Sequence, residues 1–381
     1  MLRSLSIENF RAFPRFKMAG LGRINLCVGT NNCGKTSILE AISILVANGR
    51  ADALFQVLSR RGEYWTENTQ SNNRRSEFDI RHLFHGHELV RSSSFKVRAN
   101  NDIQSQYLTA RIIERDTTDF HDGPKVQTSL FEDSGANFGD LTAFNDAKNL
   151  ALELKWEGTS PALRQLRVTT RGGILNGIAL FAGEPIDFSL PTKFITTEAL
   201  KRDEVIALFD AIVLTPEENS VIEALRTIEP LLERIAPISS DRRGSIDSGR
   251  GGLVVKLRGS TQRIPIGSMG DGIWRLLGIA LSLVGARGGI LLVDEIDTGL
   301  HYSVMADMWR MVRETAARLD VQVFATTHSR DCVEALAAIS RAGVTSDSEV
   351  TIQRIERGID TAVAFAERDI VIAAERHIEV R

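Results

Sequence analysis

The stretch that decides the fold is residues 24–46, INLCVGTNNCGKTSILEAISILV. Its first five residues form a short apolar run that predicts a buried strand. The last ten residues have helical spacing, and no helix breaker follows before Asn48 and Gly49. Between them, the segment from Gly29 to Thr36 matches the phosphate-binding loop GxxxxGK[ST] at every fixed position. A strand, a glycine loop and a helix in this order are the opening of an α/β unit.

The chemistry of this loop follows from its residue types. Glycines let backbone N–H groups curl round a phosphate at a helix N-terminus, which already favours anions. We expect Lys35 to bridge β- and γ-phosphate oxygens of ATP and the Thr36 hydroxyl to ligate Mg²⁺. The loop residues predicted to bind the nucleotide are Gly29, Asn31, Asn32, Cys33, Gly34, Lys35, Thr36 and Ser37.

A second apolar strand supplies acidic groups. In GILLVDE, residues 289–295, four apolar residues are followed by two carboxylates at the strand's C-terminal end, the edge where open α/β sheets bind ligands. We expect Asp294 to hold the Mg²⁺ shell through water. Glu295 is then left to orient and deprotonate an attacking water.

Two further segments fit the same site. Ser268-Met-Gly-Asp-Gly272 precedes a helix, so its hydroxyl and N–H donors can form a second anion site; the alternative is an ordinary helix N-cap. TTHS, residues 326–329, ends the next apolar strand, where His328 can contact the γ-phosphate; the alternative is a capping or core histidine.

The pattern of the remaining residues divides the chain into four parts. Residues 1–50 hold the N-terminal strands and the phosphate loop, and residues 51–191 predict a β-rich lobe with insertions, including strands at SFKVRA, YLTARIIER, KVQTSLF and LALELKW. Helical spacing from Glu198 to Ile235 and a mobile glycine–serine loop, Ser239 to Gly252, make up residues 192–260. In residues 261–381 apolar strands alternate with helices, which predicts a parallel sheet covered on both faces.

Composition excludes several classes of protein. The 381 residues carry a formal net charge of −3, which excludes a polycation that holds nucleic acid with its whole surface. Three cysteines without a close pair exclude a disulfide scaffold and a four-thiolate zinc site. Because the N-terminal residues are polar, we expect no signal peptide, and no apolar run approaches the roughly 20 residues that cross a bilayer. We expect a soluble cytoplasmic protein without a membrane partner.

Five segments resemble the ATP-binding-cassette (ABC) ATPases of the SMC, RecF and OLD (overcoming-lysogenization-defect) group. IPIGSMGDGIWRLLGIAL with DEIDTGLH is especially similar to the small OLD-type AAA ATPases of bacteria. The resemblance implies one ABC-type P-loop ATPase head over residues 1–381, with a mostly parallel core sheet, an N-terminal antiparallel β lobe and a helical subdomain. The five segments are IENFRAF (7–13), GTNNCGKTS (29–37), SMGDG (268–272), LLVDEIDTGLH (291–301) and TTHS (326–329).

The resemblance also implies how the parts work. Two subunits would enclose two ATP molecules, each between the phosphate loop of one subunit and Ser268 and Gly270 of the other. Asp297 and Gly299 would lie in the loop that crosses the dimer seam, and Arg11 resembles a residue near the nucleotide. The signature reads SMGDG in place of an LSGGQ-like string, and the glutamine that completes the Mg²⁺ shell is left unassigned between Gln56, Gln70 and other positions.

Two absences narrow the group. The interval from Ala51 to Ser268 has no sustained heptads, so it predicts a compact head without SMC-type arms. No Asp-x-Asp pair occurs, although the Toprim domain of full-length OLD nucleases needs one. The resemblance therefore implies an ATP-hydrolysing switch of an anti-phage defence module that controls a separate effector, such as a Toprim-type nuclease. The alternatives are a RecF-like DNA-repair ATPase, a transporter energy subunit and a non-hydrolysing scaffold.

Three weaker signals stay open. His82, His85 and His87 suggest a metal site, against the commoner interpretation as a surface turn. Cys33 in the phosphate loop suggests redox control, against a tolerated loop residue. Paired arginines suggest contact with DNA phosphates, against solvated loop charge; they are Arg60–Arg61, Arg74–Arg75 and Arg242–Arg243.

Overall fold

The structure is a computed structural model, and in it the chain forms two compact units. The described residues are 1–67, 75–114, 150–159, 161–175, 190–198, 200, 202–226, 228–238, 252–342, 349–376, 378 and 380. The first unit comprises residues 1–5, 17–39 and 190–381, and the second comprises residues 6–16 and 40–189. Across the described ranges, no helix has the length and apolar character that crossing a membrane requires.

A six-stranded sheet forms the centre of the first unit. Counted in their order across the sheet, the first five strands are parallel, and the sixth, at one edge, pairs antiparallel with its neighbour. Every residue of the three middle strands β15, β16 and β3 is buried, as expected for strands covered on both faces. In spatial order the strands are β11 (Thr192–Ile195), β15 (Ile290–Val293), β16 (Gln322–Thr326), β3 (Ile24–Val28), β17 (Val350–Arg354) and β18 (Val363–Ala366).

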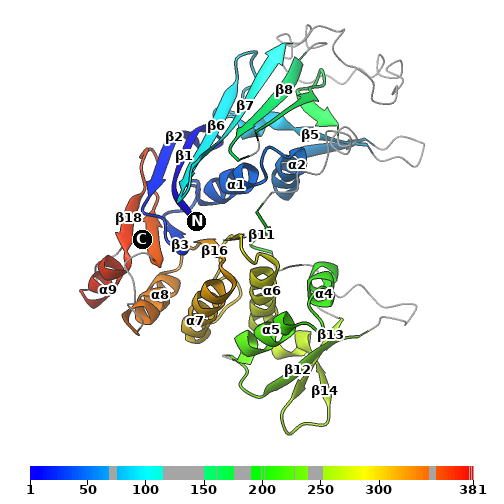
Figure 1. Cartoon of the computed structure of the whole chain (residues 1–381), viewed down its shortest axis with the longest axis vertical. Coiled ribbons are helices and arrows are strands. Elements are labelled where there is room, and N and C mark those ends of the chain that lie inside the picture. Colours follow the sequence, from blue (N-terminus) through cyan, green and yellow to red (C-terminus); the bar gives the residue numbers. More distant parts are fainter. Residues whose placement is uncertain are drawn as a thin grey trace. The chain divides into compact units, whose positions relative to one another are not determined.

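Helices cover this sheet and bury a continuous apolar core. Figure 1 shows α6, α7 and α8 side by side along one face of the sheet. Their apolar stripes meet the strands, and Trp274 and Trp309 are among the largest fully buried side chains. A small antiparallel sheet of β12 (Leu232–Pro237), β13 (Leu253–Leu257) and β14 (Arg263–Pro265) adjoins α5. The helices are α4 (Arg202–Asp210), α5 (Pro216–Arg226), α6 (Asp271–Gly285), α7 (Tyr302–Leu319), α8 (Arg330–Ala342) and α9 (Glu367–Glu375).

The second unit is built on antiparallel strands. The strand order is β2-β1-β6-β7-β8-β9, and the four strands from β6 to β9 pair antiparallel. Its strands are β6 (Ser94–Asn101), β7 (Ser105–Glu114), β8 (Leu150–Glu157) and β9 (Ala162–Arg167), with β4 (Tyr64–Glu67), β5 (Arg75–Asp79) and β10 (Gly173–Leu175) in a smaller sheet. The elements β1 (Leu2–Phe10), β2 (Phe13–Ala19) and α1 (Lys35–Val46) run from one unit into the other.

Most predicted elements are confirmed. The mostly parallel core sheet and the strands at SFKVRA, YLTARIIER and LALELKW are present, the last three as β6, β7 and β8. KVQTSLF, residues 125–131, and nearly all of the glycine–serine loop up to residue 251 lie outside the described residues.

Two stretches differ from the expected elements. Ala51–Arg60, at the start of the predicted β lobe, is helix α2, and its apolar residues pack on one side. The helical spacing expected as far as Ile235 ends earlier, because β12 begins at Leu232 and pairs with β13. Residues 232–237 form a strand because β13 pairs with them, and the spacing of apolar residues within 232–237 does not reveal that partner.

Candidate active site

The phosphate loop has a backbone that only glycine tolerates at its first position. Gly29 has φ +145°, and a Cβ there would lie 2.3 Å from the Ile355 carbonyl oxygen. Gly34 and Asn32 also have positive φ, at 102° and 60°. The loop therefore turns sharply from β3 into α1, which leaves the first N–H groups of α1 without intrahelical partners.

Lys35 lies across this loop. Its Nζ donates to the carbonyls of Gly29 and Thr30, each at 2.9 Å, and the residue is 8 % exposed. Thr30, Asn31 and Asn32 are exposed at the rim, whereas Cys33 and Ser37 are buried. The ammonium group has three donors, so it can reach a phosphate while it keeps its hold on the loop. A loop of this shape and donor set fits a nucleotide phosphate.

The second apolar strand brings its carboxylates to the same place. Thr36 Oγ1 lies 2.9 Å and 3.2 Å from the two carboxylate oxygens of Asp294, which directly follows β15. Thr326 Oγ1, at the end of β16, donates to Asp294 Oδ1 at 2.6 Å. A hydroxyl facing a carboxylate at the mouth of a phosphate loop is the oxygen donor set that suits Mg²⁺.

Glu295 is held in an unusual backbone conformation. Its φ is +46°, and its N–H donates to Thr326 Oγ1 at 2.8 Å. Its carboxylate lies 3.4 Å from His328 Nδ1 and 3.5 Å from Thr298 Oγ1. The Glu295 and His328 side chains are 34 % and 52 % exposed, so a water can reach the pair.

The loop after Glu295 is hydrogen-bonded to the TTHS segment, residues 326–329. Thr327 Oγ1 donates to Asp297 Oδ1 at 2.6 Å, and Gly299 has φ +76° with open space around it. Ser268 and Gly270 are exposed just before α6, with Gly270 at φ +94°. Of the predicted site residues, those from the phosphate loop, the acidic strand end and the histidine come together in the first unit.

Arg11 belongs to the second unit and is engaged there. Its guanidinium lies 2.7 Å from Glu40 Oε2 and makes a bidentate pair with Glu63 at 2.8 Å and 2.9 Å. Arg61 also pairs with Glu40, at 2.7 Å. Burial raises the pKa of Glu40, and the two arginines act against that shift. The nucleotide contact expected of Arg11 stays a prediction.

Sequence reasoning gave no role to Thr326, which it saw only as part of the TTHS segment, and it missed Arg275. Arg275, on α6, is 4 % exposed and donates to the carbonyls of Thr196, Asp294 and Glu295 at 2.8–3.0 Å. Burial lowers its pKa, and nearby carboxylates, first that of Asp294, oppose the shift. A lone charge inside the apolar stretch GIWRLLGIALSLVG was the signal that could have found it.

The histidine cluster, the cysteines, the candidate glutamines and the paired arginines lie away from any further site in the described residues, or lie outside those residues. His82 contacts Asp79 and His87 in a surface turn, and no group of three metal-ligating side chains forms within the described ranges. All three cysteines are buried and free, and burial raises the pKa of Cys27 to about 12. Gln56 is exposed on α2 and accepts from Arg60. Gln70, Arg74 and Arg242–Arg243 lie outside the described residues, as does the Arg75 side chain.

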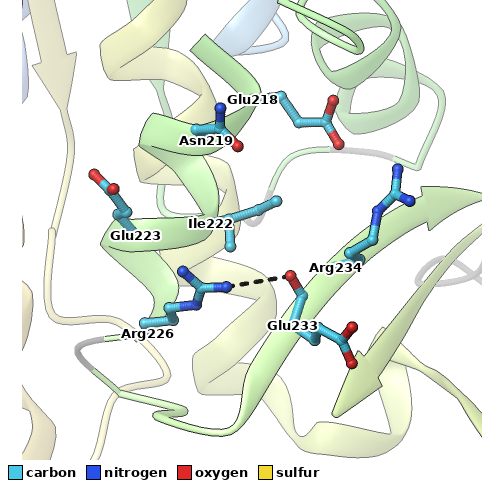
Figure 2. A pocket seen from close by; sticks show the side chains of 7 residues that line it. All are labelled: Glu218, Asn219, Ile222, Glu223, Arg226, Glu233 and Arg234. Carbon is cyan, nitrogen blue, oxygen red and sulfur yellow. Dashed lines mark hydrogen bonds between the residues drawn. The ribbon is translucent and has the colours of Figure 1, made fainter. Parts of the chain in front are cut away.

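A polar pocket of the first unit is separate from these residues. It lies between α5 and β12, where the Arg226 guanidinium donates to the Glu233 carbonyl at 3.3 Å (Figure 2). The same guanidinium donates to the Leu232 carbonyl at 2.7 Å. Its lining shares no residue with the phosphate loop, the acidic strand end or the signature segment. The lining residues are Glu218, Asn219, Ile222, Glu223, Arg226, Glu233 and Arg234.

Comparison with known proteins agrees with this geometry. Residues 24–331 match the family described as "AAA domain, putative AbiEii toxin, Type IV TA system". The chain belongs to this family. Its α/β fold has the predicted phosphate loop and the predicted mostly parallel core sheet, whereas its place in the ABC/SMC group stays a prediction. The finer assignment to the OLD subtype stays a prediction.

Individual relatives are distant. An "ATP/GTP phosphatase" of Helicobacter pylori is 22 % identical over 361 residues, which cover 90 % of this chain and 89 % of that protein. The SMC head domain of Thermotoga maritima is 12 % identical with a TM-score of 0.45, over 96 % of this chain and 98 % of that one. A Pyrococcus furiosus Smc head bound to the C-terminal domain of ScpA is 11 % identical with a TM-score of 0.45, over 99 % of each chain.

Proposed function

We propose that this protein hydrolyses ATP to ADP and phosphate, and that it works as a switch by dimerising around two ATP molecules. The observation that carries the proposal is the convergence of Lys35, Thr36, Asp294 and Glu295 at one end of the core sheet. Thr36, Asp294, Thr326 and Glu295 are joined in one hydrogen-bonded chain. A chain of this kind fixes the positions of the reacting groups before substrate binds.

Each residue has a role that its surroundings support. Lys35 and the loop N–H groups bind and orient the phosphates, because they supply positive charge and donors at a helix N-terminus. Thr36 and Asp294 are the residues that would hold Mg²⁺, which neutralises phosphate charge when bound. Both partners offer oxygen atoms, the donor type that this hard cation requires.

Glu295 is proposed as the general base. Its carboxylate is partly exposed beside His328, and Thr326 fixes its backbone N–H. It can accept a proton from a water while Asp294 stays engaged with Thr36 and Thr326. His328 is proposed to contact the γ-phosphate and to respond to its loss.

Dimerisation would complete the site. Ser268 and Gly270 are exposed before α6, where they can offer a hydroxyl and N–H donors to the ATP of a partner subunit. The loop with Asp297 and Gly299 would lie at the seam. The open space around Gly270 and Gly299 supports close approach of another backbone.

For the biological setting we propose an OLD-like ATPase of a bacterial anti-phage or toxin–antitoxin-like module. The description of the family includes a toxin and a type IV TA system, which supports this setting. The effector, such as a Toprim-type nuclease, would then be a separate protein. The RecF-like alternative needs direct DNA contact, and Arg61, one of the paired arginines, is bound to Glu40.

Steady-state ATP turnover with Mg²⁺ tests the proposal, with and without linear double-stranded DNA. We expect Glu295→Gln to lower kcat by about 10²- to 10⁴-fold with little change in ATP affinity, because only proton abstraction is lost. Lys35→Ala should lose ATP binding. Glu314→Gln, an exposed carboxylate on α7, is the matched control and should keep wild-type turnover. Wild-type turnover in Glu295→Gln would refute the assignment, and strong stimulation by DNA would favour the RecF-like alternative.

A further inference from the structure

Arg275 bridges the carboxyl ends of two neighbouring strands of the core sheet. Its Nη1 donates to the Thr196 carbonyl at 2.8 Å, just after β11. Its Nη2 donates to the Asp294 and Glu295 carbonyls, both at 3.0 Å, just after β15. The two strands are parallel neighbours, with Ile195 opposite Val293. One planar guanidinium therefore takes three carbonyls that no ladder bond satisfies at this edge.

The same arginine belongs to the helix that starts at the signature. α6 begins at Asp271, directly after Ser268 and Gly270, and Arg275 lies about one turn into it. Gly270, the N-cap of α6, has no side chain to cap the helix, and a helix N-terminus attracts anions through its N–H groups. Any shift of α6 on binding an anion there moves the guanidinium together with the helix.

Glu295 is the residue that such a shift would reach. Its backbone has φ +46°, a conformation that a non-glycine residue keeps only when its surroundings hold it. On one side the Thr326 hydroxyl accepts from its N–H. On the other side its carbonyl accepts from Arg275 Nη2 at 3.0 Å and from the Thr298 N–H at 3.1 Å. Arg275 is the side chain that ties this carbonyl to a helix, so its loss leaves the strained residue held only by its own loop and by Thr326.

We propose that Arg275 is a positioning residue that couples the signature segment at the start of α6 to the backbone of Glu295 in the same subunit. This rests on the proposed function. The signature of one subunit would contact the ATP bound by its partner, whereas Glu295 serves its own ATP. Arg275 therefore links the two sites of the dimer, and engagement at one sets the base at the other.

Hydrogen exchange tests the positioning without any need for hydrolysis. The Glu295 and Ile296 N–H groups bond to Thr326 Oγ1 and Thr326 O. In the full chain, Arg275→Met should speed exchange of these amides and leave the phosphate loop unchanged. Arg275→Lys keeps the charge without the planar fork and should give a smaller effect; it also serves if the Met variant does not fold.

The matched control is Arg313→Met. Arg313 is another mostly buried arginine of the same unit, and it pairs with Glu349 and Glu367 at 3.3 Å and 3.1 Å, with its side chain 14 % exposed. Its loss should lower the free energy of unfolding without speeding exchange at Glu295. Unchanged exchange there in both Arg275 variants would overturn the proposal.

Kinetics separate positioning from a merely structural role. Arg275→Lys should lower kcat about 10- to 100-fold with KM nearly unchanged, because the base is misplaced while the phosphate loop is intact. In the Glu295→Gln variant, adding Arg275→Lys should lower kcat no further, since Arg275 acts through Glu295. If the fold-losses of kcat in the two single variants multiply in the double variant, the proposal is overturned. A wild-type chain without turnover would refute the proposed function instead, and the exchange result would still decide the role of Arg275.

Discussion

At the scale of single residues, the site depends on two backbone positions with positive φ. Gly29 opens the phosphate loop at +145°, and Glu295 carries the proposed base at +46°. The first angle is available because glycine has no Cβ, whereas the second is imposed on a glutamate by its neighbours. Strain of this kind concentrates at functional sites, and both residues flank the place where phosphate would bind.

Gly29→Ala should abolish ATP binding. The added Cβ would lie 2.3 Å from the Ile355 carbonyl oxygen, so the loop must shift. Gly20→Ala is the matched control, because Gly20 also has positive φ, at 64°, with open space around it. The control should lose about 1–2 kcal/mol of unfolding free energy and keep ATP binding. Titration with ATP and thermal unfolding measure both effects, and normal ATP binding by Gly29→Ala would contradict this account of the loop.

The sequence predicted the residues whose type and spacing follow from phosphate chemistry. Lys35, Thr36, Asp294 and Glu295 could be named as candidates because each stands next to a glycine loop or at the end of an apolar strand. Thr326 and Arg275 could not be assigned roles, because their partners lie on other strands. Contacts of that kind exist only once the sheet has formed.

At the scale of elements, the middle strands are joined by a buried asparagine. Asn25, on β3, bonds through its side chain to both backbone groups of Gly22, at 2.8 Å and 2.9 Å, and to the Val323 carbonyl on β16 at 3.1 Å. It also accepts from Thr351 Oγ1 on β17 at 2.9 Å. One fully buried side chain thus ties together the three strands β16, β3 and β17.

Asn25→Ala should lower the free energy of unfolding by about 2–3 kcal/mol, because buried polar groups lose their partners. Thr351→Val keeps the shape and removes one donor, so it should cost only about 1 kcal/mol. Urea unfolding of both variants measures the difference. Equal costs would show that the asparagine network does not hold the strands together.

Except for α2, elements with a strong local pattern were predicted, and those decided by a distant partner were not. The spacing of apolar residues in helices α6 and α7 and in strand β15 fits one type of secondary structure only. β12 has a short mixed sequence, LERIAP, and becomes a strand because β13 pairs with it. α2 has helical spacing in ADALFQVLSR and was missed because the surrounding lobe is β-rich.

At the scale of the whole molecule, the two units are interleaved along the chain. The unit with the phosphate loop takes its sequence from three separate segments, and β1, β2 and α1 pass from one unit to the other. α1 starts at Lys35 in the first unit, and from Glu40 its residues belong to the second, where Glu40 pairs with Arg11 and Arg61. The helix that begins at the proposed ATP site is thus shared by both units.

The central claim is that ATP joins two copies of this chain, and the most direct test is the solution mass of Glu295→Gln measured by light scattering. With saturating ATP and Mg²⁺ we predict twice the mass of the chain, and without nucleotide the mass of one chain. Adding Ser268→Arg, an exposed position before α6, should prevent the change while ATP binding persists. A mass that stays at one chain while ATP is shown to be bound, or that does not depend on ATP, would contradict the account.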